Sequence, residues 1–184
     1  MYQIVQAPHA VLTSLAKKVH KIDEPIKKIV AEMIKTLEAA KDPEGVGLAA
    51  PQIGKSLQIF VVKESPSSPI IVCINPHIDE YIDSKKPKSK KKKSEDDVKL
   101  EGCLSLSDVW GVVKRHDSVK LSYTDLSGIR RTEVFKDFLA TIIQHETDHL
   151  HGILFPKRVL EQKGTLYKSK KNADGEMIFE EITI

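Results

Sequence analysis

The chain has 184 residues, of which 40% are hydrophobic and 30% charged, and it carries a formal net charge of +3. This length and composition predict one globular domain spanning residues 1–184. The charge is modest and concentrated in residues 84–99, so it does not indicate sequence-specific nucleic-acid binding. No apolar run suits a membrane span or a signal peptide, and two cysteines are too few for a disulfide framework. These features favour a reducing cytoplasm, with an organelle matrix as the alternative.

The first part of the chain is expected to contain one long helix. A short helical turn is expected within residues 12–16, and residues 25–40 predict an amphipathic helix because their apolar side chains recur at helical spacing. Pro25 suits the first turn of that helix, and the Asp-Pro pair at 42–43 suits its end. Residues 45–54, GVGLAAPQIG, predict a tight turn; they lack the Gly-Lys-Ser/Thr of a phosphate loop.

Several short runs rich in β-branched and aromatic residues predict strands. The expected strands are residues 58–62, 70–74, 112–113, 119–123, 132–135 and 177–184. Asn75 and Pro76 should end the second of these, and Cys73 within it is expected to be a buried apolar filler. Turns are expected at 125–128 and 174–175.

Residues 84–99, SKKPKSKKKKSEDDVK, are low in complexity and rich in lysine. Such a stretch cannot contribute to a core, so it is expected to be a solvated, mobile insertion within the domain. An anchor on RNA or another polyanion is the alternative. No aromatic residues are interleaved, so base stacking is not indicated.

A histidine pair in residues 144–152, QHETDHLHG, suggests a metal site. On a helix His145 and His149 stand at i and i+4, so both imidazoles leave one face and can reach one divalent ion. Glu146, beside the first histidine, can take a proton from a water at that ion. Residues 138–143 are apolar almost all round, which predicts a buried helix, and Gly152 suits its C-terminal stop.

A catalytic metal site needs a third protein ligand and an open position. The elongated metalloprotease pattern would place a third histidine at 155, but that residue is Phe155. Cys103 is the better candidate, because Gly102 allows a bend beside it and a thiolate suits iron or zinc. An unreactive buried cysteine is the alternative reading of Cys103. The remaining candidate ligands are Glu161, Glu176, Glu180 and Glu181.

Three segments together resemble the signature motifs of the peptide deformylases. They are residues 45–52 (GVGLAAPQ), 101–105 (EGCLS) and 144–152 (QHETDHLHG), and they follow one another in the family's order and rough spacing. The resemblance extends over about residues 1–160. The expected fold is α+β, with antiparallel or mixed sheets around a central buried helix carrying HExxH, and an N-terminal amphipathic helix.

The resemblance implies hydrolysis of the formyl amide of N-formylmethionine on nascent polypeptides, with release of formate. It implies that Cys103, His145 and His149 coordinate one metal, Fe²⁺ in most of the family, with Zn²⁺, Ni²⁺ or Co²⁺ as substitutes. Glu146 would take the proton of the attacking water and pass it to the departing amine.

The resemblance also assigns residues to the substrate. The side-chain amide of Gln52 and the backbone N–H of Leu104 match the family's oxyanion donors. Gly47 matches the glycine whose backbone pairs with the substrate. The methionine pocket is matched by Val46, Phe138 and Ile142, each of which also suits a plain core position.

The sequence adds one hypothesis and differs from the family at several points. Glu101 and Arg115 bracket the Cys103 segment and are expected to pair, which would fix Cys103. Residues 106–108 are Leu-Ser-Asp, where the family usually has an aliphatic residue and proline, and Trp110 stands near the expected peptide entrance. A transient ribosome contact through residues 84–93 is a further hypothesis.

Two competing functions remain at this point. A metallopeptidase would share the helix but use a carboxylate or a third histidine as ligand, so it predicts that Cys103→Ser retains metal. A non-catalytic module that binds N-termini or polyanions predicts that Glu146 is dispensable. Both enzyme hypotheses predict that Glu146→Ala binds metal without turnover.

Overall fold

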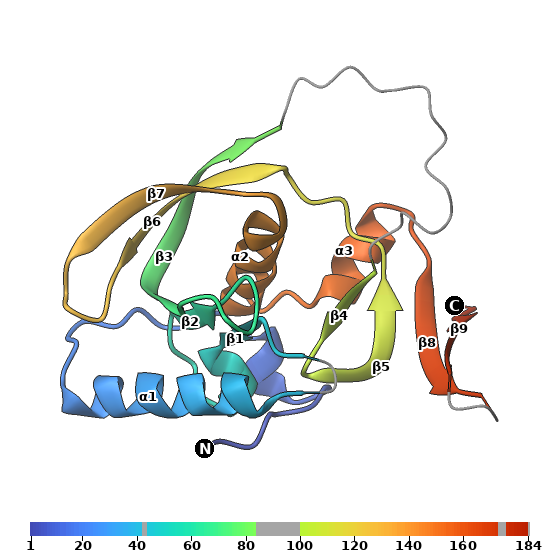
Figure 1. The fold of residues 1–184 in the computed structure, drawn as a ribbon, viewed down its shortest axis with the longest axis horizontal. Helices are drawn as coiled ribbons and strands as arrows, with labels where there is room; N and C mark the ends of the chain where they lie inside the picture. The colour runs from blue at the N-terminus through green and yellow to red at the C-terminus, as the bar shows by residue number, and fades with distance from the viewer. Residues whose placement is uncertain (42–43, 84–99, 173–175, 184) are drawn as a thin grey trace.

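The structure, a computed structural model, describes residues 1–41, 44–83, 100–172 and 176–183. The α+β class is confirmed: the described residues form two antiparallel sheets and three α-helices (Figure 1). The lysine-rich residues 84–99 and the turn at 174–175 lie outside them, as does the helix stop at 42–43. None of the helices in the described part is long and apolar enough to cross a membrane.

The first sheet has the strand order β1-β2-β3-β6-β7, with every neighbouring pair antiparallel. Its strands are β1 Gly47–Ala49, β2 Ile59–Val62, β3 Ile71–Ile82, β6 Ser118–Thr124 and β7 Arg130–Lys136. The predicted strands 58–62, 119–123 and 132–135 are confirmed by β2, β6 and β7. Gly128 takes a φ of 83° in the turn predicted at 125–128, a conformation that glycine adopts without strain.

Strand β3 does not stop where the sequence predicts. It passes through Asn75 and Pro76 and continues to Ile82. The register against β6 shifts between Ile74 and His77, so this irregularity accommodates the proline, which has no N–H to give to the ladder. Cys73 is fully buried in β3, as predicted, and burial raises the pKa of its thiol well above the usual value.

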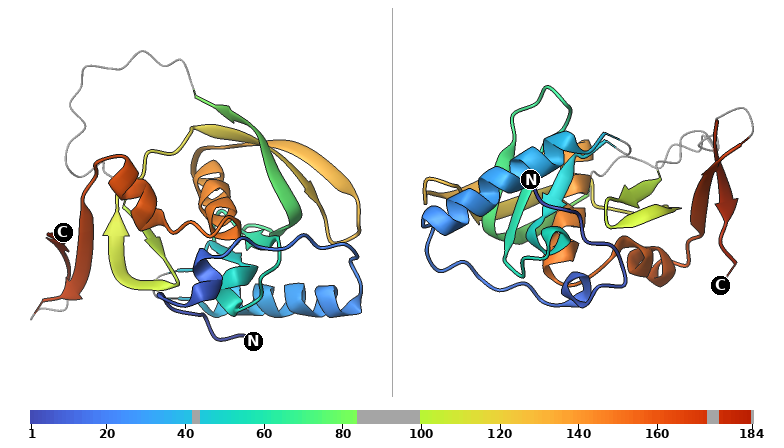
Figure 2. Two further views of the ribbon diagram at one scale, coloured as in Figure 1. Left: turned by 180° about the vertical axis from the view of Figure 1, so that it is seen from behind. Right: turned by 90° about the horizontal axis from the view of Figure 1, so that it is seen from below.

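The second sheet has the order β4-β5-β8-β9 and is also antiparallel. Its strands are β4 Glu101–Cys103, β5 Leu106–Gly111, β8 Leu166–Lys171 and β9 Met177–Glu181. The prediction of a strand at 112–113 is wrong, because the residues that pair with neighbouring strands are those just before it, in β5. The strand predicted at 177–184 is shorter, and β8 was not predicted. β8 and β9 lie at the outer side of this sheet, away from α1 (Figure 2).

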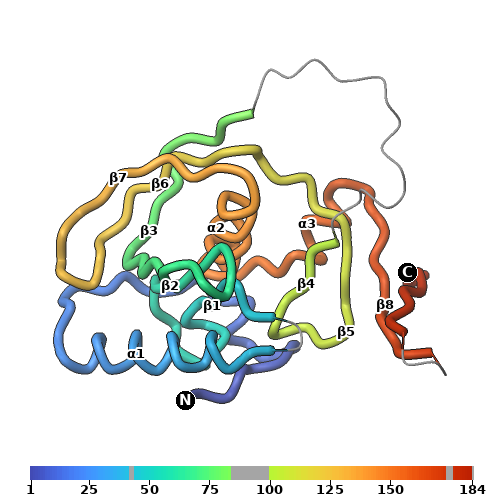
Figure 3. Tube along the Cα trace, in the orientation of Figure 1, coloured from blue at the N-terminus to red at the C-terminus, as the bar shows by residue number. Residues whose placement is uncertain are grey.

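Three α-helices complete the fold. Helix α1, Glu24–Ala39, confirms the predicted amphipathic helix: Asp23 caps its first turn, and Val30, Met33 and Leu37 are buried. Helix α2, Asp137–Leu150, contacts both β1 and β6 (Figure 3), and every residue from 142 to 150 is buried. Gly152 follows with a φ of 69°, as expected of a helix stop. Helix α3, Phe155–Glu161, was not predicted.

Two 3₁₀ turns revise the predictions for the first 54 residues. The turn expected at 12–16 lies earlier, at Ala10–Thr13. The glycine-rich residues 45–54 are not merely a tight turn: they hold strand β1 and a buried 3₁₀ turn, Ala50–Ile53. This segment lies beside α2, so its small residues allow a close approach of backbone to helix.

Candidate active site

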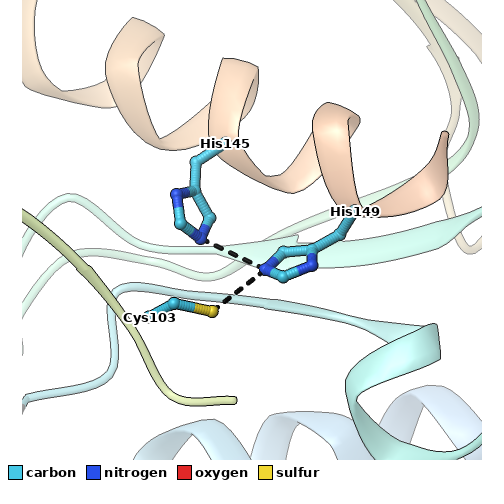
Figure 4. A group of neighbouring side chains, drawn as sticks. All are labelled: Cys103, His145 and His149. Carbon is cyan, nitrogen blue, oxygen red and sulfur yellow. Dashed lines mark hydrogen bonds between the residues drawn. The ribbon is translucent and has the colours of Figure 1, made fainter. Parts of the chain in front are cut away.

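Three side chains from helix α2 and strand β4 point toward one another (Figure 4). Nε2 of His149 lies 3.2 Å from Nε2 of His145 and 3.2 Å from Sγ of Cys103. All three donor atoms lie within 4.8 Å of one another, and all three residues are buried. Helix α2 supplies the histidines one turn apart, and β4 brings the thiol from the second sheet.

This donor set fits a metal ion. Around a tetrahedral ion with bonds of about 2.0–2.3 Å, neighbouring donor atoms are roughly 3.3–3.6 Å apart, close to the separations found here. Burial lowers the pKa of His149 well below its usual value. His149 is thus held as the neutral imidazole that a metal requires. Burial acts in the same direction on His145, but the hydrogen bonds of that ring to Cys103 and Glu101 outweigh it and raise the pKa of His145. One thiol and two imidazoles suit iron or zinc.

Glu101 orients the first histidine. Nδ1 of His145 donates to Oε1 of Glu101 at 2.6 Å, which directs Nε2 toward Cys103 and His149. Arg115 also donates to Glu101, from Nη2 at 2.7 Å and Nε at 3.1 Å. Burial opposes the charge on this carboxylate, but the hydrogen bonds from His145 and Arg115 outweigh it and lower the pKa of Glu101 to about 2.

The predicted pairing of Glu101 with Arg115 is therefore confirmed, whereas its expected target differs. Glu101 contacts a histidine rather than Cys103. The network extends further than predicted, because Nη1 of Arg115 donates to Asp148 at 2.6 Å and Arg158 binds the same carboxylate through two nitrogens. Asp148 thus ties the helix of the histidines to α3.

Gln52 lies in the 3₁₀ turn Ala50–Ile53, and both the oxygen and the nitrogen of its side-chain amide make hydrogen bonds. Its Oε1 accepts from the backbone N–H of Ala49 at 2.8 Å, so its Nε2 must face the site. That nitrogen lies 3.5 Å from Sγ of Cys103 and 3.3 Å from Oγ of Ser105. The side chain consequently presents N–H donors beside the three metal-binding candidates.

Glu146 is almost fully buried, at 3% exposure, and burial raises its pKa to about 7. Its Oε2 is without a hydrogen-bond partner among the described residues. A Cβ built at Gly47 would lie only 2.3 Å from its Oε1, so the carboxyl group rests directly against the backbone of β1. A carboxyl group with this pKa can take up and release a proton near neutrality.

A cavity of about 910 Å³ opens onto this cluster. Its lining includes every predicted site residue except His149, whose Nε2 lies 3.2 Å from Sγ of Cys103 and from Nε2 of His145, both of which line the cavity. The lining residues that were predicted are Val46, Gly47, Gln52, Cys103, Leu104, Phe138, Ile142, His145 and Glu146. Trp110 and Glu101 line the same cavity.

The other candidate ligands lie elsewhere in the described part of the chain. Glu161 pairs with Arg158, Glu180 pairs with Lys170, and Glu176 bonds to Asn172. Phe155, at the position of the metalloprotease third histidine, is buried with its ring stacked 6.3 Å from that of His145.

Sequence reasoning missed some of the residues that support the site. Ser105 is fully buried, and its backbone N–H donates to Sγ of Cys103 at 3.4 Å. Asp148 and Arg158 were missed as well. The available signal was Asp148 itself, since a carboxylate inside an apolar buried helix requires a cationic partner.

A buried cysteine and two histidines, with a glutamate beside them and a cavity in front, define the site of a metal-dependent hydrolase. A family model described as polypeptide deformylase matches residues 1–164. The chain belongs to this family, hydrolases that remove the formyl group from nascent peptides.

Individual relatives are similar over most of their length. A peptide deformylase of Desulfotalea psychrophila is 36% identical over 172 residues, covering 91% of this chain and 93% of the relative. One of Dictyoglomus turgidum is 41% identical over 162 residues, covering 87% and 93%. A crystal structure of a class I type b peptide deformylase from Acinetobacter baumannii, bound to Met-Ala-Ser, has a TM-score of 0.72 at 31% identity and covers 86% of this chain and 98% of that one.

Proposed function

We propose that the formyl group is removed at the cluster of Cys103, His145 and His149, and that these residues hold one divalent metal. The observation that carries the proposal is the convergence of Sγ and two Nε2 atoms at 3.2 Å spacings in a buried site. We propose Fe²⁺ as the metal, with Zn²⁺, Ni²⁺ or Co²⁺ as substitutes, because a mixed thiolate and imidazole set suits these ions.

The chemistry that the metal supplies is Lewis acidity, which lowers the pKa of the attacking water and polarises the formyl oxygen. Glu146 is the general base. Its free Oε2 and its pKa of about 7 allow it to accept the proton of the water and to deliver it to the departing amine. The contact with Gly47 keeps the carboxyl group beside the bound peptide.

Attack on the formyl carbon creates an oxyanion that needs hydrogen-bond donors. Gln52 is one donor, because its Oε1 is held by Ala49 and its Nε2 faces the site. The backbone N–H of Leu104, next to Cys103, is the second. Donors that are already oriented stabilise the transition state without reorganisation, and each is typically worth about 10²–10³ in rate.

The substrate is an N-formylmethionyl peptide, which we place in the cavity of about 910 Å³. Gly47 pairs with its backbone, and Val46, Phe138 and Ile142 form the methionine pocket. Ile142 is buried and packs against Gly47, whereas Phe138 is 42% exposed at the cavity rim. The side chain of the substrate methionine is flexible and unbranched, so it suits a pocket with one buried and one open wall.

The test is formate release from formyl-Met-Ala-Ser by anaerobically purified protein, with metal content measured on the same samples. Glu146→Ala should retain the metal of the wild type and lose about 10²–10⁴ in rate, the contribution typical of a general base. Glu161→Ala is the matched control, since this exposed glutamate lies on α3 outside the cavity, and it should behave as wild type.

Two outcomes would contradict the proposal. One is formate release by Glu146→Ala at the wild-type rate, or formate release by neither protein, which is what the non-catalytic binding module predicts. The other is release of methionine or Ala-Ser from the peptide without formate, which would favour the metallopeptidase.

We further propose that the protein acts in the cytoplasm and that the lysines of residues 84–93 make a transient contact with the ribosome. The support is the run of like charge, which suits a polyanionic surface. Ribosome pelleting with these lysines changed to serine should show reduced binding at low salt. Unchanged binding would contradict the contact while leaving the catalytic proposal intact.

A further inference from the structure

The hairpin formed by β8 and β9 lies beyond residues 1–164, the part of the chain that the family model matches. It is nevertheless joined to the site. Strand β8 pairs with β5 in a register that sets Tyr167 opposite Trp110, and β5 in turn pairs with β4, the strand that ends at Cys103. One sheet therefore connects the hairpin to a metal-binding candidate.

Two side chains of the hairpin hold the indole of Trp110. Its Nε1 donates to Oγ of Ser169 at 3.0 Å, and Ser169 is only 4% exposed. The ring of Phe179 meets the indole edge to face, with centroids 5.9 Å apart and planes at 88°. Ser169 and Phe179 are register partners in β8 and β9, so both contacts come from one point of the hairpin.

The indole also rests on Gly102, the residue before Cys103. A Cβ built at Gly102 would lie 2.7 Å from Cζ3 of Trp110 and 2.8 Å from its Cε3. The ring is therefore held between the hairpin and the backbone of β4. It lines the same cavity as Cys103 and Glu146, so one side of it is open to a bound ligand.

We propose that the hairpin positions Trp110 as a wall of the peptide groove that selects an apolar side chain at one of the two residues following the formylmethionine. The inference rests on the proposed function, since the ligand is the peptide of that reaction. Trp110 contacts the substrate, and Ser169 and Phe179 are positioning residues. A fixed aromatic surface favours apolar groups over carboxylates, because a carboxylate beside it would lose water without gaining a partner.

Fluorescence reports on this wall directly, because Trp110 is the only tryptophan in the chain. In metal-loaded protein, Ser169→Ala and Phe179→Ala should increase quenching of the emission by acrylamide, and the peptide Met-Leu-Ser should protect against quenching in the wild type. Phe179→Tyr should restore the wild-type value, since Phe179 is 43% exposed and a hydroxyl can reach water.

Kinetics test the selectivity. Two pairs of substrates are compared, formyl-Met-X-Ser and formyl-Met-Ala-X, in which X is leucine or aspartate. The ratio of kcat/KM for the leucine peptide to that for the aspartate peptide is measured in each pair, and the wild type should prefer leucine at one position. Phe179→Ala and Ser169→Ala should lower that ratio about threefold to tenfold, as expected for loss of one aromatic contact or one hydrogen bond, and mainly through KM. Trp110→Ala, which removes the aromatic surface itself, should abolish the preference.

Met177→Ala is the matched control, because Met177 lies on β9 two residues before Phe179 and is equally exposed, at 44%. Equal effects of Met177→Ala and Phe179→Ala would overturn the proposal, as would a wild-type ratio near one at both positions. If the wild type releases no formate from any peptide, the proposed function fails. Protection of Trp110 by Met-Leu-Ser would then still decide whether the wall binds peptides.

Discussion

Replacing Gly47 with alanine adds one methyl group at the point where β1 meets the proposed general base. That methyl would lie 2.3 Å from Oε1 of Glu146, 2.8 Å from its carboxyl carbon and 2.8 Å from Cγ2 of Ile142. The backbone itself tolerates alanine, because Gly47 does not have a positive φ. The change therefore acts on the side chains that surround it.

The size of the effect follows from these distances. A carbon and an oxygen need about 3.4 Å, so the carboxyl group must move by roughly 1 Å, and a displacement of that size near the reacting atoms costs about 10² in rate. Crowding at this buried position should also lower the free energy of unfolding by about 1–3 kcal/mol. Metal content should not change, since Cys103, His145 and His149 are untouched.

The assay is formate release from formyl-Met-Ala-Ser, normalised to bound metal. Gly128→Ala serves as the control: its Cβ meets nothing within 4 Å, so it should affect stability through its φ of 83° and leave the rate unchanged. A Gly47→Ala protein with full metal and wild-type kcat/KM would refute the placement of Glu146 against the bound peptide.

Three further substitutions test the supporting residues. Glu101→Gln replaces an acceptor of His145 with an amide and should weaken metal binding about 10–100-fold, measured by chelator competition; unchanged affinity would show that orientation of this histidine is unimportant. Asp148→Asn removes the carboxylate charge that the buried Arg115 and the partly exposed Arg158 share, and it should lower the free energy of unfolding by about 3 kcal/mol, measured by thermal denaturation; Lys27→Ala, which breaks an exposed pair, should leave stability nearly unchanged. Gln52→Glu keeps the acceptor for the backbone but loses the donor, so kcat should fall about 10²–10³ with little change in KM; a rate close to wild type would exclude it as an oxyanion donor.

Features set by local spacing were predicted well. Helix α1 follows from its period and its Asp23 cap, and the placement of His145 and His149 on one helix face follows from the i, i+4 rule. The hairpin of β6 and β7 follows from alternating residues on either side of a glycine turn.

The second sheet was mostly missed because its pairing is not local. Strand β8, LYKSKK, is rich in lysine and resembles a solvated loop until β5, more than fifty residues earlier, supplies its partner. Strand β5 likewise carries the polar pair Ser107 and Asp108. Propensity cannot identify strands whose stability comes from distant neighbours.

The site, like the fold, has some features that local spacing reveals and others that depend on distant segments. Glu146 beside a histidine pair was evident from the helix alone, but the residues could not by themselves decide between Cys103 and four glutamates as the third ligand. That choice depends on a sheet that brings β4 against α2, and on the resemblance to a known family. The link from Arg115 through Asp148 to Arg158 joins three separate segments and leaves no periodic signal in the sequence.

X-ray absorption at the metal edge of the anaerobically purified protein tests the central claim most directly. The wild type should show one sulfur neighbour at about 2.3 Å together with nitrogen neighbours near 2.0–2.1 Å, and Cys103→Ser should lose the sulfur. Cys73→Ser, which removes the other cysteine, should leave the spectrum unchanged. A fully loaded wild-type site without a sulfur neighbour would contradict the account.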